Sequence, residues 1–100
     1  MLYRVDIAPE AAKEIEEIYL YIAQDSPGNA ARWYFAIHDS IQTLSESPNR
    51  CPVAFESRFY SYEIRNLIFG SYRVLFRVKE PEQRVQILHV KHGARKRTPF

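Results

Sequence analysis

The feature that most constrains the fold is a change in the spacing of apolar residues at the proline-containing segment from Ser47 to Pro52. Before this segment, apolar residues recur every three or four positions, which is the period of a helix with one buried stripe. After it, they alternate with polar residues, which is the period of a strand with one buried face. The spacing therefore predicts an α+β fold in which two helices precede most of the sheet.

The first helix is predicted to begin near Pro9, a residue that suits the first helical turn. Its buried stripe consists of Ala11, Ile15, Ile18 and Ile22, spaced by four, three and four positions. Turn-forming residues from position 25 to position 29 end this helix.

A second helix is predicted to follow at once, because Ser26 and Pro27 resemble an N-cap and a first helical residue. Its apolar residues recur at spacings of four, three, four and three; they are Ala30, Tyr34, Ile37, Ile41 and Leu44. The short connection predicts that the two helices form an antiparallel hairpin.

Alternating apolar residues predict four strands, at Leu2–Ala8, Tyr60–Leu67, Tyr72–Val78 and Val85–His92. The last three are joined by short loops, so they are predicted to form an antiparallel meander. The N-terminal strand is too short to stand alone and is expected to join the same sheet, with the helices packed across one face. No linker divides the chain, so residues 1–100 are predicted to form one domain.

The alternation also predicts which arginines lie on the face away from the helices. In the strand Tyr72–Val78, the apolar side chains face the helices and Arg73 and Arg77 point the other way. The same reasoning places Tyr60, Tyr62 and Ile64 inward, and it places Arg65 on the open face beside the other two arginines.

A hairpin around Gly70 whose paired residue numbers sum to roughly 140 would bring Glu63 close to Arg77. The simplest expectation for that pair is a surface salt bridge, which stabilises a fold by only about 0–1 kcal/mol. Arg65 and Arg73 then remain as the foremost candidates for binding an anion.

Charge is distributed unevenly along the chain, although the net charge is only +2. Residues 1–50 contain 4 Lys/Arg and 8 Asp/Glu, whereas residues 51–100 contain 10 and 4. The densest positive segment comprises Lys91, His92, Arg95, Lys96 and Arg97. Such a segment suits a polyanion or an acidic protein, and the alternative is an ordinary solvated tail.

Other classes of chemistry are disfavoured by the sequence. His89 and His92 lie three apart on a strand and so face opposite sides, and no metal site or other cofactor is expected. Cys51, the lone cysteine, is expected to be structural and fits a reducing compartment. No apolar run approaches the roughly 18 residues of a membrane span, so a cytoplasmic protein is expected.

Several segments together resemble the RelE/ParE toxin superfamily. They are Tyr3-Arg4-Val5, Pro9-Glu10-Ala11-Ala12, Glu63-Ile64-Arg65-Asn66-Leu67, Gly70-Ser71-Tyr72-Arg73-Val74-Leu75-Phe76-Arg77-Val78 and Val90-Lys91-His92-Gly93-Ala94-Arg95. The resemblance covers nearly the whole chain. It implies a toxin of a type II toxin–antitoxin, or plasmid-stabilisation, module that is held inactive by a cognate antitoxin protein.

Two target classes follow from this resemblance. RelE-like members cut messenger RNA on the ribosome with clustered basic residues and a tyrosine, whereas ParE-like members block DNA gyrase. For a nuclease, Arg65 and Arg73 match two basic positions and Arg95 approximately matches a third. Glu63, however, stands where a lysine is expected, and Phe100 stands near the tyrosine position without a hydroxyl to donate a proton.

The segment from His92 to Arg95 is also more similar to the ParE branch, so the resemblance favours a gyrase inhibitor that is not an enzyme. Its expected target-binding residues are Arg65, Arg73, Lys91, His92, Arg95, Lys96 and Arg97. Trp33 and Phe35 are candidates for antitoxin binding, with ordinary core packing as the alternative. A ribosome-dependent nuclease and a non-toxic nucleic-acid or protein-binding module remain the other two hypotheses.

Overall fold

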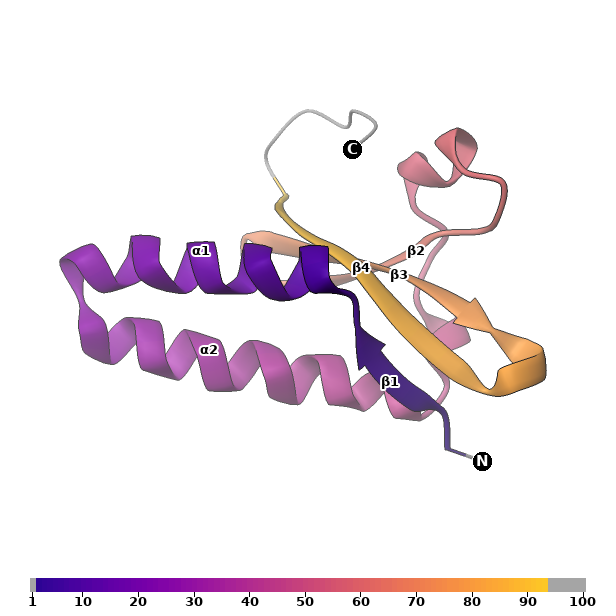
Figure 1. The fold of residues 1–100 in the computed structure, drawn as a ribbon, viewed down its shortest axis with the longest axis horizontal. Coiled ribbons are helices and arrows are strands. Elements are labelled where there is room, and N and C mark those ends of the chain that lie inside the picture. Colours follow the sequence, from indigo (N-terminus) through magenta and orange to yellow (C-terminus); the bar gives the residue numbers. More distant parts are fainter. Residues whose placement is uncertain (1, 94–100) are drawn as a thin grey trace.

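A computed structural model of the chain describes residues 2–93 and has the expected α+β architecture. Two helices pack on one face of a four-stranded sheet, and the helical hairpin projects well beyond the sheet at its loop end (Figure 1). The elements are β1 (Arg4–Ile7), α1 (Pro9–Asp25), α2 (Pro27–Gln42), β2 (Arg65–Phe69), β3 (Tyr72–Lys79) and β4 (Arg84–His92).

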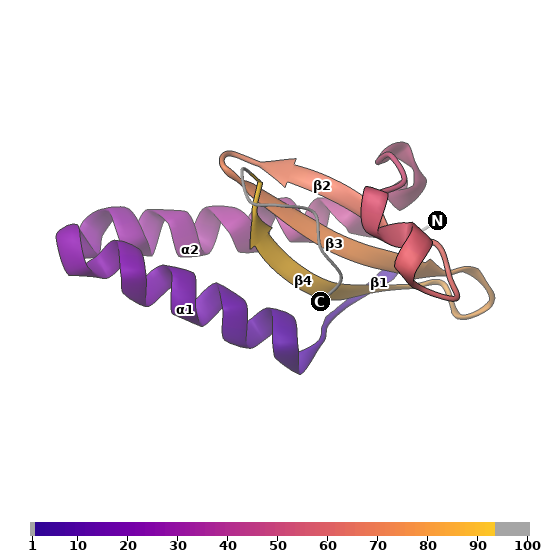
Figure 2. The same ribbon diagram turned by 90° about the horizontal axis from the view of Figure 1, so that it is seen from above.

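The sheet has the strand order β1-β4-β3-β2, which makes β1 and β2 its edges (Figure 2). The last three strands form the predicted antiparallel meander. The N-terminal strand joins them as expected and runs parallel to β4, from the pair Arg4 and Arg84 to the pair Ile7 and Ile87. The two strands that form this edge are therefore about eighty residues apart in the sequence.

The main core lies between the helix pair and the sheet. The predicted helical stripes supply Ile15, Ile37 and Ile41, and the inward side of β3 supplies Val74 and Phe76, all of them at most 2% exposed. Burial of one such side chain stabilises a fold by about 1.5–3 kcal/mol, so this layer accounts for most of the cohesion between helices and sheet.

The connection between the helices follows the sequence prediction. The Ser26 hydroxyl accepts a hydrogen bond from the Asn29 backbone N–H at 3.2 Å, and Pro27 is the first residue of α2. An N-cap of this kind satisfies one of the backbone donors that a helix start leaves unpaired, and it typically contributes about 1 kcal/mol.

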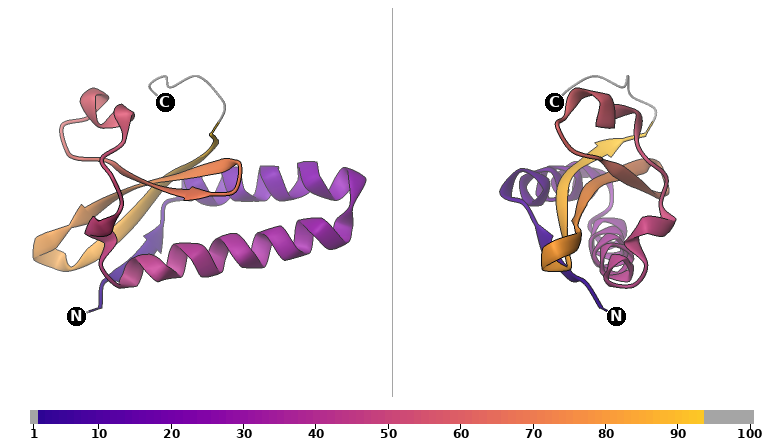
Figure 3. Two further views of the ribbon diagram at one scale, coloured as in Figure 1. Left: turned by 180° about the vertical axis from the view of Figure 1, so that it is seen from behind. Right: turned by 90° about the vertical axis from the view of Figure 1, so that its right-hand side faces the viewer.

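The predicted strand Tyr60–Leu67 is wrong at its start, because β2 begins only at Arg65. Before it, the chain forms a short 3-10 helix, η3 (Phe55–Phe59), on the face of the sheet opposite the helices (Figures 1 and 3). A second, smaller core there buries Ala54, Ile64 and Leu75, with Tyr60 and Tyr62 packed against it. The alternation that suggested a strand comes from this packing, so the expected inward placement of Tyr60, Tyr62 and Ile64 is also wrong.

Candidate functional site

Arg73 points away from the helices, as predicted, but it lies buried beneath η3. Its two terminal nitrogens each donate a hydrogen bond of 2.7 Å to the carboxylate of Glu56, which is 1% exposed. Its Nε donates to the Asn66 side-chain oxygen at 3.2 Å. These hydrogen bonds to the Glu56 carboxylate raise the pKa of Arg73 above its usual value. Arg73 therefore stays charged and anchors η3 to the sheet.

Arg65 does not share a face with Arg73, and this prediction is wrong. Paired residues of β2 and β3 have numbers that sum to 141, so Arg65 lies opposite Phe76, whereas Ile68 lies opposite Arg73. A shift of one residue in register moves every side chain to the other face. Arg65 Nη1 donates to the backbone oxygen of Cys51 at 2.5 Å, so it fastens the preceding loop to the start of β2.

The prediction that Glu63 forms a salt bridge with Arg77 is also wrong. Glu63 instead lies 2.9 Å from Arg65 Nη2. The guanidinium carbon of Arg77 sits 3.7 Å from the centre of the Tyr62 ring, which is a cation–π contact. Of the arginines predicted on the open face, Arg73 is therefore buried under η3, and Arg77 stacks on an aromatic ring near the end of β3.

The described part of the basic C-terminal segment lies at the end of β4. Lys91 Nζ is 2.5 Å from a carboxylate oxygen of Glu14 on α1, and the His92 ring packs edge-on to Tyr72 at 5.4 Å. The Gly93 backbone N–H donates to the Ser71 backbone oxygen at 2.6 Å. The other predicted residues of this segment, Arg95, Lys96 and Arg97, lie outside the described residues.

The two candidate antitoxin contacts differ in their surroundings. Trp33 is partly buried against the main core, with its ring 5.4 Å from that of Tyr72. Phe35 is 67% exposed on α2. Leu20 and Tyr21 are similarly exposed, at 55% and 68%, in the last turns of α1. Both helices of the pair therefore leave large apolar side chains exposed.

A protein-family model matches most of the chain. The model described as "ParE toxin of type II toxin-antitoxin system, parDE" matches residues 5–97. The chain belongs to the ParE toxin family. It is thus a type II toxin–antitoxin toxin with the ParE/RelE fold. Among curated proteins, none matches the sequence.

Solved structures of such systems share the fold of this ParE-family chain. A chain of the chromosomal ParDE system from P. aeruginosa superposes with a TM-score of 0.72 at 21% identity, covering 91% of this chain and 96% of that one. A chain of the RelBE2 toxin–antitoxin complex from Mycobacterium tuberculosis gives 0.60 at 21% identity, with coverages of 92% and 99%. A chain of the archaeal RelE–RelB complex from Pyrococcus horikoshii gives 0.56 at 20%, with 96% and 100%.

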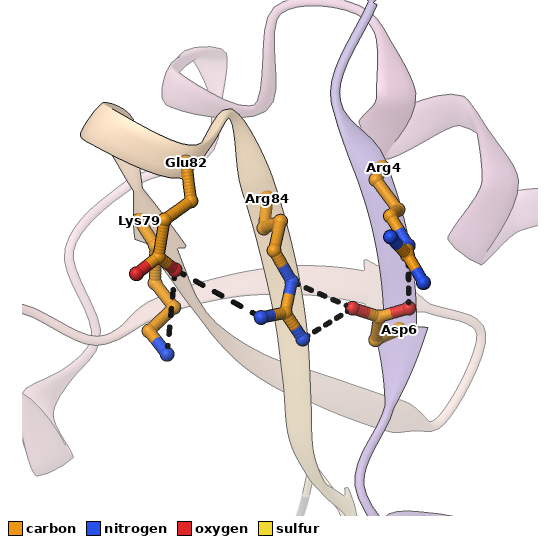
Figure 4. Close-up of polar contacts among 5 residues, drawn as sticks. All are labelled: Arg4, Asp6, Lys79, Glu82 and Arg84. Carbon is orange, nitrogen blue, oxygen red and sulfur yellow. Dashed lines mark hydrogen bonds and ion pairs between the residues drawn. The ribbon is translucent and has the colours of Figure 1, made fainter.

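In this ParE-family toxin, a chain of charges fastens β1 to the rest of the sheet (Figure 4). Arg84 donates to one Asp6 oxygen from Nε at 2.8 Å and from Nη2 at 2.6 Å, and Arg4 lies 3.5 Å from the other oxygen. Glu82 links Arg84 to Lys79, at 3.9 Å and 3.6 Å. The hydrogen bonds from Arg84 lower the pKa of Asp6.

Residues 2–93 contain neither a candidate metal site nor a candidate membrane-spanning helix. In that range, no three His, Cys, Asp or Glu side chains gather closely enough to hold a metal ion. His89 pairs with Leu75 and His92 with Tyr72, which puts the two rings on opposite faces of the sheet. No helix in the same range is long and apolar enough to cross a membrane. Burial raises the pKa of the Cys51 thiol, so the thiol is kept protonated.

Glu56, the partner of Arg73, was not predicted from the sequence. The signal was present, because Glu56 is the only carboxylate in the run from Phe55 to Tyr60, whose other members are three aromatic residues, one serine and one arginine. A single acid in such a run is a natural partner for a sheet arginine. No element was predicted for the residues between Pro52 and Tyr60, so the pairing was not expected.

Proposed function

We propose that this toxin acts by binding DNA gyrase and blocking it, and that it is not a ribosome-dependent nuclease. The observation that carries the proposal is the separation of Arg65 from Arg73. They lie on opposite faces of the sheet, and each already holds a carboxylate, Glu63 or Glu56. Phosphodiester cleavage without a metal needs positive groups that converge on one phosphate, and these two do not.

An inhibitor needs a complementary surface instead of converging catalytic groups. We place that surface at the end of β4, at Lys91 and His92, and along the basic residues that follow in the sequence, Arg95, Lys96 and Arg97. A dense positive segment accelerates encounter with an acidic partner and weakens with added salt. The resemblance to the ParE branch supplies gyrase as the target class.

The proposal includes a cognate antitoxin. Three of the structural relatives come from toxin–antitoxin systems, ParDE and RelBE among them. The exposed Phe35, Leu20 and Tyr21 on the helix pair offer apolar surface to a segment that folds upon binding. In this role the toxin acts in the cytoplasm of its host, as part of a module that maintains a plasmid or resides in a chromosome.

The test is a pair of assays on the purified toxin, gyrase-dependent supercoiling of plasmid DNA and cleavage of messenger RNA on programmed ribosomes. The informative variant replaces Arg95, Lys96 and Arg97 with alanine. The matched control removes three exposed cations elsewhere, Lys13, Arg32 and Arg58.

We expect the wild type and the control to stop supercoiling and to leave messenger RNA intact. The triple variant in the basic segment is expected to inhibit at least about tenfold more weakly, since each lost charge contact removes part of the electrostatic attraction. Messenger RNA cut on the ribosome, with supercoiling unaffected, would replace this proposal with the nuclease. Inactivity in both assays would favour a non-toxic binding module.

A further inference from the structure

A cavity of about 240 Å³ opens where β3 extends past the start of β2. Beyond the pair Arg65 and Phe76, the residues from Arg77 to Lys79 keep β4 as a neighbour but have no β2 residue across from them. The cavity is lined by Asn49, Tyr62, Glu63, Arg65, Arg77, Val78 and Glu80. None of the roles proposed above uses this cavity.

Arg77 is the one guanidinium of the cavity without a carboxylate partner among residues 2–93. Its guanidinium stacks on Tyr62 at 3.7 Å, and its buried Nε has no hydrogen-bond acceptor within that range. Arg65 Nε, in the same lining, is likewise buried without an acceptor. Buried donors that lack a partner are rare and costly in folded proteins, so two in one lining single out the site.

The two carboxylates in the lining do not offset Arg77, because both are engaged. Glu63 pairs with Arg65 Nη2 at 2.9 Å. Glu80 accepts hydrogen bonds from the Tyr3 hydroxyl and from the Asn49 amide, both at 2.9 Å. These hydrogen bonds lower the pKa of Glu80, so it stays ionised. The cavity thus contains two acids that already have partners, and one stacked cation that has no acidic partner among residues 2–93.

We propose that this cavity binds the carboxylate of an acidic side chain presented by an extended segment of a partner protein, with Arg77 as the anion-binding group. Tyr62 is a positioning residue that holds the guanidinium by stacking. No β2 residue lies across from Val78, and an open strand edge of this kind suits an extended peptide, which adds main-chain hydrogen bonds to a sheet edge. The inference does not depend on which target the toxin acts upon.

A protein segment fits this cavity better than a nucleic acid does. The volume is below the roughly 300–1,000 Å³ of pockets that hold whole small ligands, so it suits one side chain. Glu63 and Glu80 in the lining would repel the successive phosphates of a nucleic-acid strand. A single carboxylate approaches Arg77 with far less of this repulsion.

The experiment follows the Nε–H signal of Arg77 and the amide signal of Val78 by NMR on isotopically labelled toxin made by cell-free synthesis, at low salt. The probes are acetyl-Ala-Glu-Ala-amide, its glutamine counterpart and inorganic phosphate. The variant is Arg77→Gln. Arg58→Gln is its control, because Arg58 also stacks on an aromatic ring, that of Phe55 at 4.3 Å, but lies outside the cavity.

We expect the glutamate peptide to shift both signals to saturation, with a Kd on the order of 1 mM. The glutamine peptide should produce no saturable shift. Arg77→Gln should weaken binding, read at Val78, about tenfold or more, and Arg58→Gln should match the wild type.

Equal shifts from the two peptides, or undiminished binding in folded Arg77→Gln, would overturn the proposal. So would phosphate binding that is tighter than the peptide and lost in Arg77→Gln, since it would assign the site to a phosphate-bearing ligand. Should Arg77→Gln not fold, the comparison of the two peptides on the wild type decides the outcome alone.

Discussion

Glu56 and Arg73 form a two-point ion pair in which both carboxylate oxygens accept hydrogen bonds of 2.7 Å from the guanidinium, beneath η3. Removal of one partner leaves the other charge buried and unpaired, which typically costs about 3–5 kcal/mol. We therefore expect Arg73→Ala and Glu56→Ala each to lower the free energy of unfolding by that order, measured by urea denaturation. The double variant Glu56→Leu/Arg73→Met should be less destabilised than either. Additive losses would show that the pair is not coupled.

Asp6 and Arg84 predict a pH dependence of stability. A carboxyl whose folded-state pKa is lowered stabilises the fold above its unfolded pKa of about 3.9, and this contribution is lost as pH falls through the folded-state value. The urea midpoint of the wild type should therefore fall more steeply below about pH 4 than that of Asp6→Asn. Asp39→Asn, at an exposed position on α2, is the control and should keep the wild-type slope.

Trp33 and Phe35 should respond differently to truncation. Trp33→Ala opens the edge of the main core and is expected to cost about 3 kcal/mol of stability. Phe35→Ala, at an exposed site, should change stability by no more than about 0.5 kcal/mol and should weaken antitoxin binding. Calorimetric titration with the antitoxin measures the second effect. Unchanged affinity in Phe35→Ala would remove this side chain from the proposed interface.

Gly70 forms the tip of the β2–β3 hairpin with a φ of 56°, in the left-handed region. A Cβ there would meet no atom within 4 Å, so the cost of replacement is conformational and not steric. We expect Gly70→Ala to lose about 1 kcal/mol and Gly70→Asn to lose less, because asparagine tolerates this conformation better. Thermal unfolding of the two variants checks the order, and a larger loss for asparagine would contradict it.

The helices and the meander could be predicted because their apolar spacing is long and regular. Ile15, Ile37 and Phe76 all lie where periodicity placed them. The parallel pairing of β1 with β4 could not be predicted, since residues so far apart carry no local signal of their direction. Alternation of apolar and polar residues predicts that one face of a strand is buried, but it does not show which element of the fold covers that face.

The site was harder to predict because it depends on register. The numbers of paired residues in β2 and β3 sum to 141 and not to 140. This shift of one residue places Arg65 on the face of Phe76 and Asn66 beside Arg73. The basic residue types were recognised, but their grouping was not. Tyr60 and Tyr62 alternate as they would in a strand, yet they lie before β2 and pack against the smaller core, and only three-dimensional contacts distinguish the two cases.

The pairing of β1 with β4 also has a consequence for the order in which this toxin forms. Val5 and Asp6 have no sheet neighbour until Val85 and Gln86 have been synthesised, so the N-terminal edge and the ion pair of Asp6 with Arg84 can form only after most of the chain has been made. Contacts of such long sequence separation slow folding. While the ribosome is still adding β4, the helix pair has only a partial sheet against which to pack. The newly made chain therefore passes through an interval in which it exposes apolar surface and is not yet an assembled toxin.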